Sequence, residues 1–100
     1  MSNYVSYYTF FSDNLKLIKD IKADFQAEKL SGAVFDKRYS TFLNKLISRC
    51  RTFSGETLLG SSKVVKNYIT DIGNTVAYTK QGERFDKLIQ ITEHFMRSSM

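Results

Sequence analysis

Apolar residues recur along almost the whole chain at steps of three and four, and no proline interrupts the pattern. This spacing places the apolar residues on one face of an α-helix, whereas proline is the residue that most strongly breaks helices. A chain of 100 residues has room for one hydrophobic core. We therefore predict a single helical domain over residues 1–100, of the all-α class, built as a small antiparallel bundle of about four helices.

The first helix is expected from about Tyr4 to Leu30. Its apolar face is predicted to consist of Tyr4, Tyr8, Phe11, Leu15, Ile18 and Phe25. A competing interpretation starts this helix at Ser12 or Asp13 and leaves Tyr4 to Phe11 as a strand or an extended arm, because Tyr, Val, Thr and Phe favour strands. The runner-up architecture is accordingly a three-helix core with an aromatic N-terminal arm.

The other helix boundaries are predicted from glycine, serine and the apolar spacing. The second helix is expected from Val34 to Thr52 and the last from Glu83 to Arg97. Between them, a third helix is predicted to run from an N-cap at Ser54 toward Lys80, or to begin its main part at Ser62. Gly73 would then lie in the middle of this third helix.

Positive charge is concentrated between Lys37 and Lys66. This stretch has seven basic residues and one acidic residue, a net charge of +6, so the rest of the chain carries −1 of the total +5. The candidate residues for binding nucleic acid or an acidic partner are Arg38, Lys45, Arg49, Arg51, Lys63 and Lys66. On a helix, the first three fall within about 40° of arc, beside the core-facing residues, and the last three flank the following turn.

This basic block suits phosphate groups or an acidic protein surface, because phosphate contacts require charge and donors and demand no particular fold. The more ordinary interpretation is a solvated face that keeps the protein soluble. Our first hypothesis is a non-enzymatic binding protein that docks through this surface on nucleic acid, or on a protein that handles it. The bias toward Lys, Asn, Tyr, Phe, Ile and Ser is typical of small accessory proteins from AT-rich genomes, including phages.

The second hypothesis concerns the aromatic N-terminus. As an extended arm it would expose Tyr4, Tyr7, Tyr8, Phe10 and Phe11, and soluble monomers rarely leave so much contiguous apolar surface open. These residues would therefore either pack against the chain's own core or anchor a protein–protein contact. The second case describes an adaptor, an inhibitor or a structural homo-oligomer.

An acidic ridge is expected on the first helix, where Asp20, Asp24 and Glu28 repeat every four residues. Interleaved lysines would pair with it on a solvated face. Alternatively, the ridge would face the basic stripe of a second subunit through opposite charges. A metal site would also need ligands from a facing helix, and none is evident.

No catalytic, cofactor or metal site is expected. Cys50 is the only cysteine and His94 the only histidine, which excludes zinc sites of the Cys/His type, and Cys50 is predicted to be a small core residue. The stretch from Gly55 to Gly60 superficially resembles a phosphate-binding P-loop, but Lys63 comes two positions too late and no strand precedes it. We expect no small-molecule substrate.

A lone cysteine and the lack of a signal-peptide or membrane-span pattern predict a protein of the cytoplasm that does not engage a membrane.

Overall fold

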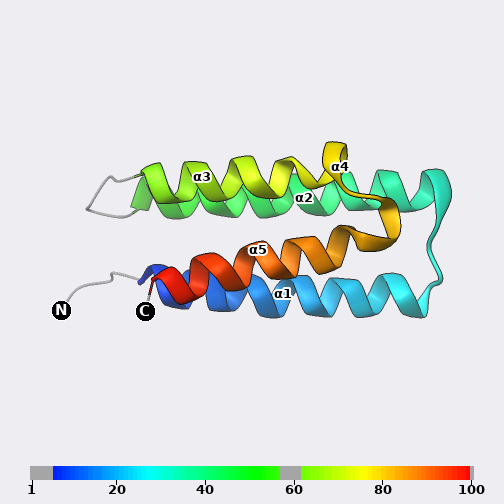
Figure 1. Ribbon diagram of the computed structural model, residues 1–100, viewed down its shortest axis with the longest axis horizontal. Helices are drawn as coiled ribbons and strands as arrows, with labels where there is room; N and C mark the ends of the chain where they lie inside the picture. The colour runs from blue at the N-terminus through cyan, green and yellow to red at the C-terminus, as the bar shows by residue number, and fades with distance from the viewer. Residues whose placement is uncertain (1–5, 57–61, 100) are drawn as a thin grey trace.

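The computed structural model describes residues 6–56 and 62–99, and within them the chain forms a bundle of four long helices (Figure 1). The long helices are α1 (Tyr7–Ala27), α2 (Gly32–Glu56), α3 (Ser62–Gly73) and α5 (Arg84–Ser98). The one-turn helix α4 (Thr75–Tyr78) and the 3-10 turn η1 (Gln81–Glu83) connect α3 to α5.

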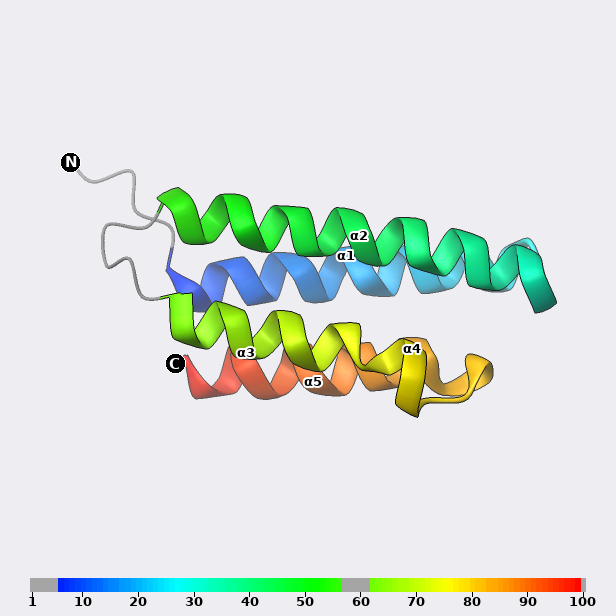
Figure 2. The same cartoon turned by 90° about the horizontal axis from the view of Figure 1, so that it is seen from above.

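Figures 1 and 2 together show α2 and α3 in one layer and α1 and α5 in the other, with neighbouring helices antiparallel. The prediction of an all-α, antiparallel bundle of about four helices is confirmed. The pairs α1 with α5 and α2 with α3 pack most closely.

Helix α1 begins at Tyr7, between the two predicted starting points. Ser6 is its N-cap, and the Ser6 hydroxyl accepts a hydrogen bond from the backbone N–H of Thr9 at 3.1 Å. The interpretation of an extended arm is therefore wrong for residues 7–11, whereas Tyr4 lies outside the described residues. The helix ends because Lys29 adopts a positive φ of 53°, a conformation usual just past a helix C-terminus.

The boundary between α2 and α3 differs from the prediction. Helix α2 continues to Glu56, so Ser54 lies inside it and does not cap the next helix. Burial of Phe53 accounts for the extra turn, because its ring stacks on Phe10 and holds the last part of α2 against α1. Helix α3 begins at Ser62, which was one of the two predicted starts.

Helix α3 ends at Gly73, where the prediction continued it toward Lys80. Glycine has low helix propensity because it loses the most backbone entropy on folding. The chain turns at Asn74 and forms the separate short helix α4. Gly73 therefore terminates a helix and does not occupy the middle of one.

The core holds an aromatic cluster near each end of the bundle. One cluster consists of Tyr7, Phe10, Phe11, Phe53, Tyr68 and Phe95. The other consists of Phe25, Phe35, Tyr39, Phe42 and Phe85. Large rings supply much apolar area per residue, which suits a domain with a small core.

The buried face of α1 is rotated from the predicted one. Tyr8 was expected inside and is 40% exposed, whereas Phe10 is buried. Asn14 is fully buried although it is polar, and it was not predicted to face the core. Apolar residues occur in two adjacent rows on α1, and the spacing alone does not show which row faces the core.

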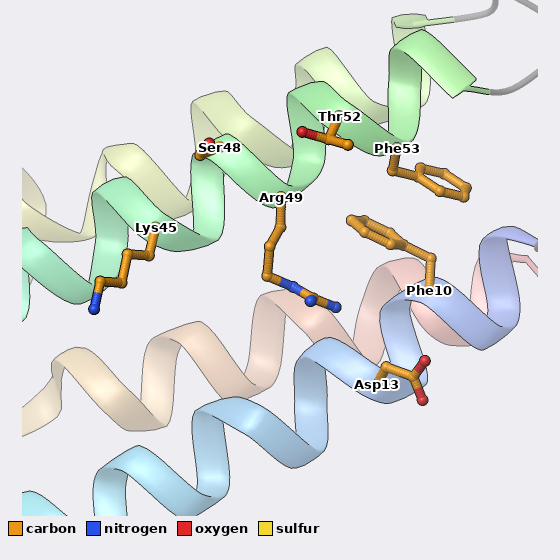
Figure 3. A pocket seen from close by; sticks show the side chains of 7 residues that line it. All are labelled: Phe10, Asp13, Lys45, Ser48, Arg49, Thr52 and Phe53. Atoms are coloured by element: carbon orange, nitrogen blue, oxygen red, sulfur yellow. The ribbon is translucent and has the colours of Figure 1, made fainter.

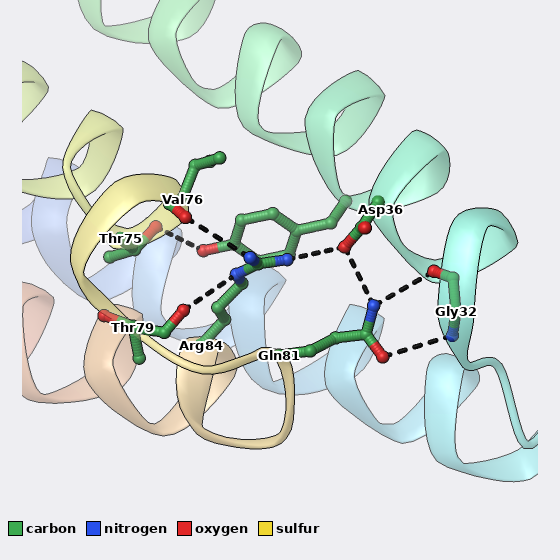
Figure 4. Close-up of polar contacts among 8 residues, drawn as sticks. Gly32, Asp36, Thr75, Val76, Thr79, Gln81 and Arg84 are labelled. Carbon is green, nitrogen blue, oxygen red and sulfur yellow. Dashed lines mark hydrogen bonds and ion pairs between the residues drawn. The ribbon is translucent and has the colours of Figure 1, made fainter.

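A polar cluster fastens the turn before α5 to the start of α2 (Figure 4). The Gln81 amide accepts a hydrogen bond from the Gly32 N–H and donates to the Gly32 carbonyl and to Asp36. Arg84 donates to the same Asp36 oxygen at 2.7 Å, and its guanidinium lies 5.6 Å from the centre of the Tyr39 ring. These contacts position α5 relative to α2.

Two aromatic residues of α1 provide a test of the core. We expect Phe11→Ala to lower the free energy of unfolding by about 3–5 kcal/mol, because it leaves a cavity between two helix layers. The matched change Tyr8→Ala, on the exposed side of the same helix, should cost less than about 1 kcal/mol. Urea unfolding followed by circular dichroism measures the free energy of unfolding of both variants. Similar small losses of stability in the two would contradict the burial of Phe11 in the core.

Asp36 makes the stability of the bundle depend on pH. Hydrogen bonds from Gln81 and Arg84 lower the pKa of Asp36 below its ordinary value of 3.8. A lowered native pKa means that the ionised carboxylate stabilises the fold above that ordinary value, and that this contribution is lost as the pH falls through the native pKa. We expect the stability difference between the wild type and Asp36→Asn to shrink as the pH falls below 3.8.

Urea unfolding at several pH values measures this difference, with Asp71→Asn on α3 as the control for losing one exposed carboxylate. A difference between the wild type and Asp36→Asn that stayed constant from neutral to acid pH would show that the cluster in Figure 4 does not act through this carboxylate.

Candidate functional site

Helices α1 and α2 are tied together at both ends. At one end, the rings of Phe10 and Phe53 stack with centroids 4.1 Å apart and planes 7° from parallel (Figure 3). At the other end, Arg38 Nη1 donates to Glu28 Oε1 at 2.9 Å. Phe10 and Glu28 are 18 positions apart, which corresponds to about 27 Å of helix.

Two hollows of about 440 and 920 Å³ lie between these ties. Lys45 and Arg49 line both hollows, so the two form one continuous feature, which we call the α1/α2 groove. Figure 3 shows both side chains projecting from α2 toward α1.

The lining of the groove is apolar with charged edges. Its apolar side chains are Leu17, Ile21 and Phe25 from α1 and Val34 and Phe42 from α2. Val34 is 54% exposed, and Leu17 and Ile21 are half-buried. Its basic side chains all come from α2 and are Lys37, Arg38, Lys45 and Arg49.

The six predicted basic residues separate into two sets. The groove set lines the α1/α2 groove and consists of Arg38, Lys45 and Arg49. The outer set consists of Arg51, Lys63 and Lys66, all exposed. Each residue of the outer set comes two positions before a buried core residue, which turns it about 200° away from the core. The expected single basic surface is therefore two surfaces.

The α1 side of the groove is acidic. Asp13 lines the groove, Glu28 pairs with Arg38, and Asp20 and Asp24 are exposed. At 100° per residue these four acids fall within about 80° of arc, beside the row that lines the groove.

The lysines interleaved with this ridge do not neutralise it. Lys22, expected to pair within the ridge, instead donates to Asp86 of α5 at 2.7 Å. The residues that line the groove include one acid, Asp13, and four bases from α2, so the lining has a formal charge of +3. The other three acids of α1 are exposed beside this lining and place negative charge along its α1 edge. Its field runs across the groove from one helix to the other.

Arg49 also contacts a buried polar network that the sequence did not predict. Its Nε donates to Oδ1 of Asn14 at 3.4 Å, and the hydroxyls of Tyr68 and Thr92 lie 2.8 Å apart. Burial raises the pKa of Tyr68, while hydrogen bonds with Thr92 and Asn14 lower it. Because these residues come from four helices, the network helps to fix their packing, and Arg49 has a structural role beside its place in the groove.

Most of the aromatic candidates belong to the core. Phe11 is fully buried, Phe10 is 6% exposed, and Tyr7 packs edge-on to Phe53 with ring centroids 5.5 Å apart. Tyr8 is exposed, and Tyr4 lies outside the described residues. Residues 7, 10 and 11 therefore pack against the chain's own core, which was one of the two predicted alternatives.

The remaining candidates for chemistry do not come together. Cys50 is fully buried, and His94 is exposed on α5. Within residues 6–56 and 62–99, no three side chains of His, Cys, Asp or Glu are grouped as a metal site would need. Most of the stretch that resembles a P-loop, residues 57–61, lies outside the described part of the chain.

None of the described helices combines the length and the apolarity needed to cross a bilayer. Comparisons of the chain with protein-family models, with curated proteins and with solved structures gave no match. The function is therefore inferred from the geometry and charge of the α1/α2 groove.

Cys50 should be unreactive in the folded protein. Burial raises the pKa of its thiol from 9.0 to about 12, with Arg49 opposing the rise. Since the thiolate is the reacting form, a rise of this size lowers its population at pH 8 by a factor of about 1,000. We expect an aromatic disulfide reagent to modify the native thiol slower than the urea-unfolded thiol by at least this factor. Equal rates would show that Cys50 is accessible and ionisable.

Proposed function

We propose that this protein is a non-enzymatic protein-interaction module, and that the α1/α2 groove docks a helical segment of a protein partner. The observation that carries this proposal is the combination of an apolar lining with charged edges of both signs in one elongated groove. Leu17, Ile21 and Val34 supply the apolar contacts, and Lys45 and Asp13 mark the two charged sides.

Helix-in-groove recognition uses this combination. An amphipathic helix inserts apolar residues spaced three and four apart into a hydrophobic groove, and its polar flanks meet the charged edges. The distance between the two ties, about 27 Å, matches a helical segment of about 18 residues. The exposed Val34 and the half-buried Leu17 and Ile21 would gain burial on docking, which is the favourable term in most protein association.

The acidic edge and the apolar lining of the groove favour a protein over nucleic acid. Binding to a phosphate backbone depends on positive charge, and the acids along the α1 edge would repel phosphates there. Its apolar lining also has no counterpart on a phosphate backbone. Nucleic acid, the first hypothesis from the sequence, would have to use the outer set of exposed cations, Arg51, Lys63 and Lys66, which makes it the second candidate.

Val34 allows the groove to be tested without disturbing the core. We expect Val34→Glu to abolish affinity capture of a protein partner, because it places a charge in the apolar lining. The matched control is Val76→Glu, an exposed valine on α4 outside the groove, which should leave capture unchanged. Capture from lysate, after nuclease treatment and with mass-spectrometric identification, is the measurement.

The charge-reversed outer variant, Arg51→Glu with Lys63→Glu, separates the two candidates. Groove docking would be contradicted, and nucleic acid favoured, by three results together. Nuclease treatment would remove all captured material, the outer variant would lose binding, and Val34→Glu would retain it.

A further inference from the structure

We propose that the α1/α2 groove binds a second copy of this chain, in a symmetric dimer whose two-fold axis runs along the bundle. The acidic α1 side of each copy then faces the basic α2 side of the other copy. This inference rests on the proposal that the α1/α2 groove is a protein-docking surface, and it names a second copy as the occupant. In this dimer the occupant presents two helices, one over each side of the groove, in place of a single inserted helix.

Unpaired charges of both signs on one face are the first observation. Asp20 and Asp24 on α1 and Lys37 and Lys45 on α2 are exposed. None of the four takes part in an ion pair or side-chain hydrogen bond within the described residues. Among the described residues, the one ion pair between α1 and α2 is that of Arg38 with Glu28.

Symmetry decides which arrangement of two copies satisfies these charges. The interface of a two-fold dimer is self-complementary, and its axis lies in the plane of contact. An axis across the bundle would place α1 on α1 and α2 on α2, so that like charges would meet. An axis along the bundle places the α1 of each copy against the α2 of the other, so that Asp20 and Asp24 approach Lys37 and Lys45. Only this second axis is electrostatically favourable.

The face is large enough for such an interface. Helix α1 has 21 residues and the bundle is 21–23 Å across, which gives a projected face of roughly 700 Å². A stable interface of standard size buries about 800 Å² per partner, and a grooved face has more accessible area than its projection. The apolar residues Leu17, Ile21 and Val34 lie within this face and supply the contact between the charged sides.

Charge reversal on each side of the groove provides the test. The basic-side variant is Lys37→Glu with Lys45→Glu, and the acidic-side variant is Asp20→Lys with Asp24→Lys. These positions avoid Arg49 and Arg38, which have structural partners. The matched control is the outer variant, Arg51→Glu with Lys63→Glu. Sedimentation equilibrium from about 1 to 500 µM measures self-association, and circular dichroism confirms that each variant is folded.

We expect the wild type and the control to dimerise, and each single-side variant to self-associate at least about tenfold more weakly. An equimolar mixture of the two single-side variants should recover dimers, because each acidic α1 then meets a basic α2 and each basic α1 an acidic α2. Recovery on mixing must be intermolecular, since neither chain is repaired within itself. A chain carrying all four changes should also dimerise, which an axis across the bundle would forbid.

A wild type that stays monomeric over the whole concentration range would overturn this inference. It would also be overturned if the single-side variants dimerised like the wild type, or if their mixture did not recover dimers. Should either variant unfold, the neutral changes to Gln and Asn test the weakening on each side with a smaller perturbation, and their mixture should recover only part of the association. Failure of the dimer is distinguishable from failure of the groove function. If the protein is monomeric but its Val34→Glu variant no longer captures another protein, the groove is still a docking surface, and its partner is a different protein.

Discussion

The stack of Phe10 on Phe53 is the contact on which the groove depends. It joins the first turn of α1 to the last turns of α2, and it extends α2 past the serine expected to begin the next helix. Together with the ion pair of Glu28 and Arg38 at the far end, it sets the length of open surface between the two helices. Between these ties, partly exposed side chains of both helices line the space that remains.

The distribution of charge on this surface follows from the helix period. On α1, the acids fall beside the row that lines the groove, while Lys22 pairs with Asp86 of α5. On α2, the groove set occupies the side toward α1, and Arg51, only two residues beyond Arg49, points away. The acids along the α1 edge therefore oppose part of a block that is strongly basic in sequence. Together with the apolar lining, they are the reason that we propose a protein partner in place of nucleic acid.

The all-α class and the number of long helices could be predicted from apolar spacing, because each helix buries one stripe against the others. The start of α3 at Ser62 was one of two predicted alternatives. The end of α2 could not be predicted, since it depends on Phe10, more than 40 residues earlier in the chain. The buried Asn14 was missed for the same reason: its neighbours Arg49 and Tyr68 come from other helices.

Only the basic side of the candidate site could be predicted from the sequence. The stripe of Arg38, Lys45 and Arg49 was predicted, and the structure places these residues together in one groove. The apolar lining and the acidic opposite side arise only when α1 is placed beside α2. The role of these residues in binding stays a proposal.

The most direct test of the α1/α2 groove as an interface between copies is an isotope-filtered NMR experiment on a mixture of labelled and unlabelled protein. We expect intermolecular contacts from the methyl groups of Leu17, Ile21 and Val34, and none from Val76. Intermolecular contacts from Val76 without any from the groove, or no intermolecular contact at concentrations where the chain is fully folded, would contradict this expectation.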